Sequence, residues 1–141
     1  MKILVVDDDE SSLRMMRSIL TAERHEPYTA RNGLFGYFSF LVYRPELVLT
    51  DIEMPFQDGF EMMKQIRNID PLARTIYMSG EVERYYTRLD AERRNYAAAV
   101  LEKPFSRRDL SALISSGFRS WLRPESGARL NVSGQGFGPS A

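Results

Sequence analysis

Four apolar runs of this chain are each followed by side chains that can bind a metal ion or a phosphoryl group. These side chains are Asp7, Asp8, Asp51, Ser79 and Lys103. Three carboxylates placed close together repel one another unless a cation lies between them. An oxygen-rich, sulfur-free set suits a hard cation such as Mg²⁺, and Mg²⁺ often completes its shell with phosphate oxygens. A lysine and a hydroxyl can bind those oxygens, and an aspartate can itself be the nucleophile that forms an aspartyl phosphate.

The elements that must position these residues alternate along the chain. Apolar runs predict buried strands, and residues at helical spacing follow each run. The strands are predicted at residues 3–6, 27–30, 47–50, 75–78 and 97–101. Unbroken apolar strands joined by crossover helices indicate a parallel sheet that is covered on both faces. We therefore expect an α/β fold with a doubly wound five-stranded parallel sheet, flavodoxin-like, whose ligands bind beyond the carboxyl ends of the strands.

Helix boundaries are marked by capping residues and prolines. Asn32 precedes one predicted helix, and Pro45 and Pro71 follow two others. Ser106, with Asp109 three residues later, predicts a capping box at the start of the last helix. From residue 123 the composition shifts to Gly, Ser, Pro and Asn. We expect residues 1–122 to form one domain and residues 123–141 to be a flexible C-terminal tail or a truncated linker.

Composition limits the classes of function. The 141 residues carry 19 basic and 19 acidic side chains, so no net charge favours nucleic acid or an anionic membrane. Cysteine is absent, which excludes disulfides and thiolate chemistry. No apolar stretch approaches the roughly 20 residues of a membrane helix. We expect a cytoplasmic protein that binds neither nucleic acid nor membrane through this chain.

Four segments carry a resemblance to a known family. They are "KILVVDDDE", "LVLTDIEMPFQDGFEMMKQIR", "MSG" and "LEKPF". In their order and spacing, over residues 1–122, the chain resembles the receiver domains of two-component response regulators. The resemblance implies a phosphoacceptor that takes its phosphoryl group from a histidine kinase or a phosphotransfer protein. It implies signalling through a conformational shift toward an output partner or a homodimer, with at most slow self-dephosphorylation and no other enzymatic activity.

The resemblance also implies a role for each site residue. Asp51 would be the phosphoacceptor, with Asp8 a direct Mg²⁺ ligand and Asp7 a second-shell or water-mediated one. The backbone carbonyl of Glu53 would be a further ligand. Ser79 and Lys103 would bind the phosphoryl oxygens, and the Lys103–Pro104 bond matches a position that is often cis in this family.

Three departures from the family pattern affect regulation. Ser79 is followed by Gly80 instead of alanine, which loosens that loop. Val100 stands where many members have a tyrosine or phenylalanine that turns inward on phosphorylation, so that switch is absent or is relocated to Tyr96. Glu53 and Glu81 occupy two positions that tune phosphoryl lifetime in the family. We hypothesise that these two carboxylates alter the dephosphorylation rate.

Two other functions are compatible with the sequence. One is a receiver-like protein-binding module that works without phosphorylation, which Val100 favours and the intact acidic, hydroxyl and lysine set disfavours. The other is an aspartate-nucleophile phosphatase, because "DDDES" also reads as D-x-D-x-S after a first strand. In that enzyme Asp7 would be the nucleophile and Asp9 the general acid.

Overall fold

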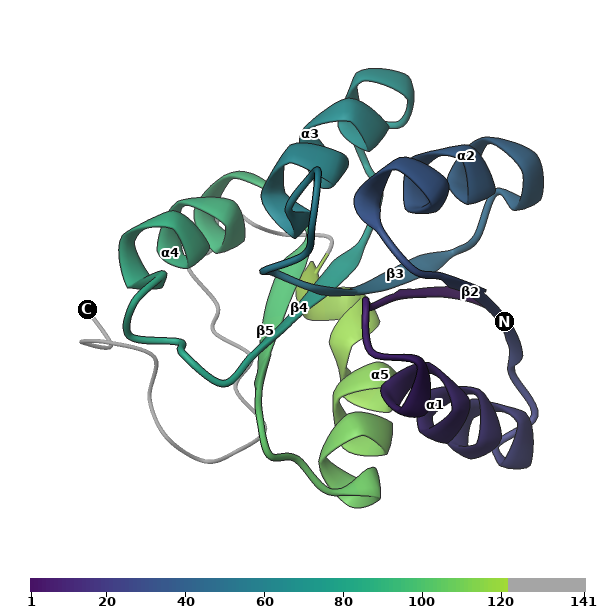
Figure 1. The fold of residues 1–141 in the computed structure, drawn as a ribbon. Coiled ribbons are helices and arrows are strands. Elements are labelled where there is room, and N and C mark those ends of the chain that lie inside the picture. The colour runs from purple at the N-terminus through teal and green to yellow at the C-terminus, as the bar shows by residue number, and fades with distance from the viewer. Residues whose placement is uncertain (122–141) are drawn as a thin grey trace. The chain divides into compact units, whose positions relative to one another are not determined.

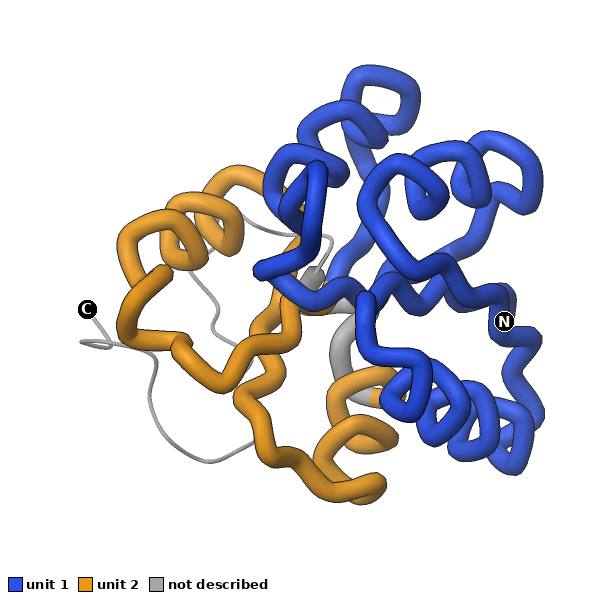
Figure 2. The backbone as a smooth tube through the Cα atoms, viewed as in Figure 1, with its two compact units in different colours: residues 1–75 blue, residues 76–141 orange. Residues whose placement is uncertain are grey.

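A computed structural model describes the backbone of residues 1–121 and the side chains of residues 1–115. The predicted tail, residues 123–141, lies outside the described residues. The chain divides into two compact units, residues 1–75 and residues 76–141 (Figure 2). In the part of the chain that the structure covers, no helix has the length and the hydropathy needed to cross a membrane.

Strands and helices alternate five times along the chain. The first unit holds β1 (Lys2–Val6), α1 (Glu10–Ala22), β2 (Glu26–Ala30), α2 (Gly33–Tyr43), β3 (Leu47–Asp51) and α3 (Gly59–Ile69). Then come β4 (Thr75–Ser79), α4 (Tyr86–Asn95), β5 (Ala98–Glu102) and α5 (Arg107–Trp121). The five parallel strands form one sheet in the order β2-β1-β3-β4-β5 (Figure 1). The predicted doubly wound α/β fold is confirmed.

The core of the first unit is built on β1 and β3. Residues 3–6 of β1 and 47–49 of β3 are apolar runs and are buried, as expected for strands covered on both faces. They pair in parallel, with Val6 opposite Thr50. Helix α1 covers one face of these strands, and α2 and α3 cover the other (Figure 1). This register brings the residues after Val6 level with the end of β3.

Strand β2 forms one edge of the sheet and pairs in parallel with β1. The Glu26 amide donates to the Met1 carbonyl, and the Ala30 carbonyl accepts from the Asp7 amide. The backbone groups of alternate residues in a strand face opposite sides. Glu26, Tyr28 and Ala30 therefore face β1, while Pro27 and Thr29 direct their backbone groups away from the sheet.

Side-chain caps begin several helices. Asn32 accepts a hydrogen bond from the Phe35 amide at 2.9 Å and starts α2, as predicted. Ser106 and Asp109 form the predicted reciprocal capping box, with hydrogen bonds of 3.0 and 3.1 Å. A second capping box, which was not predicted from the sequence, joins Asp58 and Glu61 at the start of α3.

In the second unit β4 and β5 are buried strands, and α4 supplies two buried polar contacts. The hydroxyl of Tyr77, a fully buried residue of β4, donates to the Glu92 carboxylate at 2.5 Å. On the same helix the buried Arg93 pairs with Asp90 at 3.4 Å. Arg93 is therefore not part of a solvated face, although α4 is rich in arginine.

His25 lies in the turn between α1 and β2, with its Nδ1 3.3 Å from the Met1 amino group. Partial burial lowers the pKa of its imidazole below the ordinary value of 6.5, and the positive charge of Met1 lowers this pKa further. A base whose pKa is depressed in the folded state stabilises the fold fully above its unfolded pKa. That stability is lost as pH falls through the folded pKa.

We therefore expect the His25 imidazole to titrate in NMR spectra with a midpoint below 6.5. The free energy of unfolding should fall between about pH 7 and about pH 5 by more in wild type than in His25→Gln. A midpoint at or above the ordinary value would contradict both causes of the lowered pKa, the partial burial of the ring and the charge of Met1.

Candidate functional site

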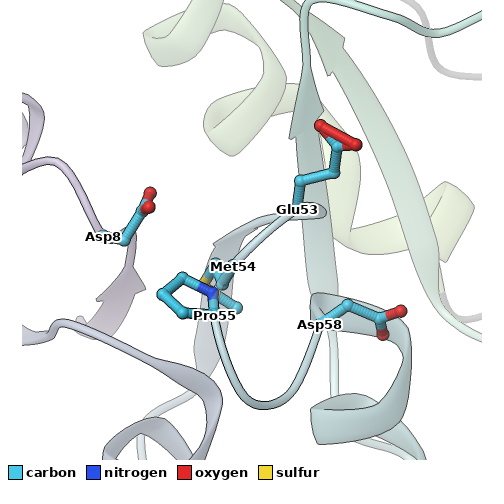
Figure 3. A pocket seen from close by; sticks show the side chains of 5 residues that line it. All are labelled: Asp8, Glu53, Met54, Pro55 and Asp58. Atoms are coloured by element: carbon cyan, nitrogen blue, oxygen red, sulfur yellow. The ribbon is translucent and has the colours of Figure 1, made fainter.

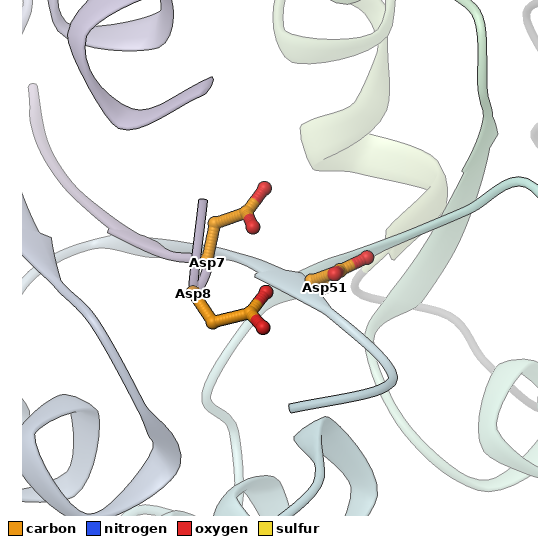
Figure 4. Close-up of side chains that lie close together, drawn as sticks. All are labelled: Asp7, Asp8 and Asp51. Carbon is orange, nitrogen blue, oxygen red and sulfur yellow. The ribbon is translucent and has the colours of Figure 1, made fainter. Parts of the chain in front are cut away.

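Three carboxylates meet at the carboxyl ends of β1 and β3. Asp7 and Asp8 follow β1, and Asp51 is the last residue of β3. Each offers an oxygen that lies within 4.8 Å of the others, and Asp8 points toward Asp51 (Figure 4). This proximity follows from the parallel register of the two strands, and it was predicted from the sequence.

Backbone contacts hold the members of this acidic cluster in place. Asp7 is only 2% exposed, and its carboxylate accepts a hydrogen bond from the Asp9 amide at 3.0 Å. Its own amide donates to the Ala30 carbonyl. Asp8 is exposed and Asp51 is half-buried. Asp51 therefore lies between a buried carboxylate and an exposed one.

The donor set fits a hard divalent cation. All three side chains are carboxylates, and their oxygens are close enough to share one ion. Carboxylate oxygens are the preferred ligands of Mg²⁺, and a cation would relieve the repulsion among the three negative charges. The residues present thus fit the metal that the sequence predicts.

An open pocket of about 400 Å³ lies beside the cluster. Its lining residues are Asp8, Glu53, Met54, Pro55 and Asp58 (Figure 3). The Glu53 side chain is exposed and points away from Asp8. The use of the Glu53 carbonyl as a metal ligand remains a prediction.

In the second unit, Ser79 and Lys103 lie at the ends of two neighbouring strands, β4 and β5. Ser79 is the last residue of β4 and is 5% exposed, and its hydroxyl accepts a hydrogen bond from the Glu81 amide at 2.9 Å. The Lys103 amide donates to the Ser79 carbonyl at 2.8 Å. The Lys103–Pro104 bond is cis, as the family resemblance implied. These contacts fix the two residues relative to each other within their unit.

Val100 is packed in β5 and is 1% exposed. Tyr96, the position to which an aromatic switch was suggested to be relocated, caps the end of α4 and is partly exposed. The polar contact of the buried Tyr77, which lies two residues before Ser79 on β4, was not predicted from the sequence. A tyrosine in a strand predicted to be buried could have indicated this contact, because a buried tyrosine hydroxyl needs a hydrogen-bond partner.

The phosphatase hypothesis requires Asp9 to donate a proton. Asp9 instead caps α1, where its carboxylate accepts hydrogen bonds from Ser11 and Ser12. These hydrogen bonds, that of the Ser11 hydroxyl first, lower the pKa of the Asp9 carboxyl. A general acid needs the opposite shift, so this geometry disfavours the phosphatase reaction.

Helix α2 leaves much of its apolar surface in contact with solvent. The exposed large side chains are Leu34, Phe35, Phe38, Val42 and Tyr43. Several of them line a groove of about 470 Å³ beside the end of β2. One face of the helix therefore does not bury all of its aromatic rings.

Comparisons with known proteins agree with this geometry. The sequence model of the response regulator receiver domain family matches residues 3–115. The chain is 31% identical over 105 residues to the chemotaxis protein CheY of Halobacterium salinarum, which covers 73% of this chain and 88% of CheY. It is 30% identical over 113 residues to the regulatory protein AtoC of Escherichia coli, which covers 80% of this chain but 24% of AtoC.

A solved structure shows the same fold. The response regulator TrrA of Thermotoga maritima, crystallised in complex with Mg²⁺-BeF, superposes with a TM-score of 0.70 at 29% identity. The match covers 81% of this chain and 96% of TrrA. Together with the acidic cluster, these findings show that the chain belongs to the response regulator receiver domain family of two-component signal transduction.

Proposed function

We propose that Asp51 accepts a phosphoryl group from a histidine kinase or a phosphotransfer protein in a Mg²⁺-dependent reaction in the cytoplasm. The observation that carries this proposal is the convergence of the Asp7, Asp8 and Asp51 oxygens within 4.8 Å. Family membership supports it, because receivers are signalling domains.

In the proposed reaction, a carboxylate oxygen of Asp51 forms a bond to phosphorus. The bond between phosphorus and the imidazole nitrogen of the donor breaks, and that nitrogen leaves with the bonding electron pair. The Asp51 carboxylate can act as the nucleophile. Strand β3 holds the backbone of Asp51 in the sheet, and this fixed position helps to align the reacting atoms and lowers the barrier.

The carboxylates of Asp7 and Asp8 and the Glu53 carbonyl are the proposed ligands of the metal, together with Asp51. A bound Mg²⁺ would neutralise negative charge on the carboxylates and on the phosphoryl oxygens. Asp7 is suited to a supporting role because it is buried and already accepts a backbone hydrogen bond. The exposed Asp8 has its oxygens open to solvent and suits direct ligation.

Ser79 and Lys103 are proposed to bind the phosphoryl oxygens, the serine by hydrogen bonding and the lysine by charge. This part of the proposal rests on the family match, which spans both residues. We further propose slow self-dephosphorylation, with a rate to which Glu53 and Glu81 contribute, and signalling through an output partner or a second copy.

Intact mass spectrometry of wild type tests the proposal. After incubation with a small-molecule phosphodonor such as acetyl phosphate, we expect one added phosphoryl group when Mg²⁺ is present. In excess chelator the labelling rate should fall at least about a hundredfold, because charge neutralisation dominates phosphoryl transfer. Under conditions that label a known receiver, no addition to this protein would favour the phosphorylation-independent binding module.

A further inference from the structure

Phe56 stands at the tip of the loop between β3 and α3 with its ring in solvent. It is 94% exposed, the largest exposed fraction among the large apolar side chains of the described residues. The two ends of the loop are joined, because the Gly59 amide donates to the Ile52 carbonyl at 2.8 Å. The ring therefore adds nothing to the core of the free protein.

The backbone at Phe56 is also unfavourable for a phenylalanine. Its φ is 73°, in the left-handed region that glycine and asparagine adopt most easily. The Gln57 amide donates to the Pro55 carbonyl at 2.8 Å and closes a three-residue turn around it. Such γ-turns with positive φ are rare and strained. An aromatic ring here costs the free protein stability without a compensating contact.

The loop nevertheless holds this ring in a defined position. The capping box of Asp58 and Glu61 fixes the start of α3. On the other side Gly33 of α2 approaches so closely that a Cβ on it would stand 2.8 Å from the Gln57 carbonyl oxygen. A side chain presented by a fixed backbone loses less conformational entropy on binding than one on a loose loop.

The same loop lines the open pocket beside the acidic cluster. Pro55 and Asp58, on either side of Phe56 in the sequence, line this pocket together with Asp8 (Figure 3). A protein that delivers a phosphoryl group from a histidine must bring the reacting atoms to roughly 3–3.5 Å from an Asp51 oxygen. Such a protein has to cover the rim of the pocket, whereas a small phosphodonor can enter without contact with the loop tip.

We propose that Phe56 is the anchor residue by which this receiver docks the protein that carries the phosphohistidine. The ring enters an apolar pocket on the surface of that protein and contributes to the affinity and the choice of donor. Aromatic side chains buried near the centre of an interface carry a large share of binding energy. The inference rests on the proposed function and identifies the part of the chain that contacts the macromolecular donor.

The test compares two donors on matched variants of the full chain. Phe56→Gly removes the ring and relieves the backbone, and Phe56→Tyr keeps an aromatic ring. Arg24→Gly relieves a similar backbone conformation, with φ of 67°, in the turn between α1 and β2. It controls for a change in stability alone. With acetyl phosphate and Mg²⁺, all three variants should be labelled at the wild-type rate within about twofold.

The second donor is a set of purified histidine kinases encoded in the source genome, each autophosphorylated with ATP. The kinase that labels wild type fastest is then used with each variant. For Phe56→Gly we expect kcat/KM of transfer to fall at least about tenfold, mainly through a higher KM, because the lost contact is one of binding. Phe56→Tyr and Arg24→Gly should stay within about threefold of wild type.

Transfer to Phe56→Gly at the wild-type rate would overturn the inference. A matching loss with acetyl phosphate would also overturn it, because the ring would then act on the loop and not on the donor. If acetyl phosphate labels wild type but no kinase in the set does, there is no phosphohistidine donor for Phe56 to bind. That result would also overturn the inference. Failure of wild type to be labelled by either donor contradicts the proposed function itself.

Discussion

Asp51→Asn should abolish phosphoryl labelling and, in the absence of metal, should make the protein more stable. The amide of asparagine is not a nucleophile for phosphorus, so the acceptor is lost while the shape is kept. The substitution also removes one of three negative charges whose oxygens lie within 4.8 Å of one another. At this separation, mutual repulsion costs about 1 to 3 kcal/mol, depending on the local dielectric.

Urea unfolding in chelator and intact mass spectrometry with acetyl phosphate and Mg²⁺ measure the two effects. Asp70→Asn is a matched control, because it removes one charge outside the cluster and asparagine can still accept the Leu72 amide hydrogen bond. The control should be labelled like wild type. Labelling that survives in Asp51→Asn and is lost in Asp7→Asn would revive the phosphatase reading.

Gly59→Ala should impair both folding and phosphorylation. A Cβ at Gly59 would stand 2.4 Å from the Asp51 carbonyl oxygen, a distance at which the backbone itself must move. Overpacking of this kind typically costs 1 to 3 kcal/mol, and we expect about 2 kcal/mol or more here. Because the displaced residue is the proposed phosphoacceptor, the labelling rate should fall about ten- to a hundredfold.

Gly80→Ala provides the comparison within the same chain. A Cβ there would meet only the Lys103 Cβ, at 4.0 Å, which is an ordinary contact. The free energy of unfolding of Gly80→Ala should rise, by less than about 1 kcal/mol, because alanine restricts the unfolded chain. Wild-type stability and labelling in Gly59→Ala would mean that the loop after β3 yields easily and does not fix Asp51.

The strands and the acidic cluster could be predicted from the sequence because each depends on local patterns. The predicted strands agree with the observed ones within about one residue at each end. Strands β3 and β4, however, include Asp51 and Ser79, which were predicted to lie just beyond them. Pairing of the backbone with neighbouring strands continues past the last apolar side chain. Both polar residues consequently belong to the sheet, which holds them more firmly than a loop would.

Features that depend on contacts between distant residues could not be predicted. Helix α2 is apolar on all sides, so the spacing of its apolar residues did not predict which face of the helix is buried. The structure turns Gly33 and Gly36 inward and leaves Phe35 and Phe38 in solvent. Small residues permit the close approach of α2, since a Cβ on Gly36 would stand 2.5 Å from the Met62 sulfur.

The left-handed backbone conformation of Phe56 could not be predicted from the sequence either. A phenylalanine after a proline gives no signal for positive φ, because residues without a β-carbon or with short polar side chains are the usual markers of that region. The conformation comes from the closure of the loop between Ile52 and Gly59 and from the hydrogen bond across Pro55 and Gln57. The sequence pattern therefore did not indicate which side chain this loop exposes.

Pro27 has a consequence for the behaviour of the protein at high concentration. An edge strand can template another strand, and this is a common route to aggregation and to domain swapping. Of the two residues of β2 whose backbone faces outward, Pro27 has no N–H, so Thr29 alone can donate from that edge. A second sheet cannot continue the hydrogen-bond ladder past Pro27. The proline thus protects this edge against polymerisation. A protein that binds at the β2 edge would therefore contact its side chains instead of pairing with its backbone.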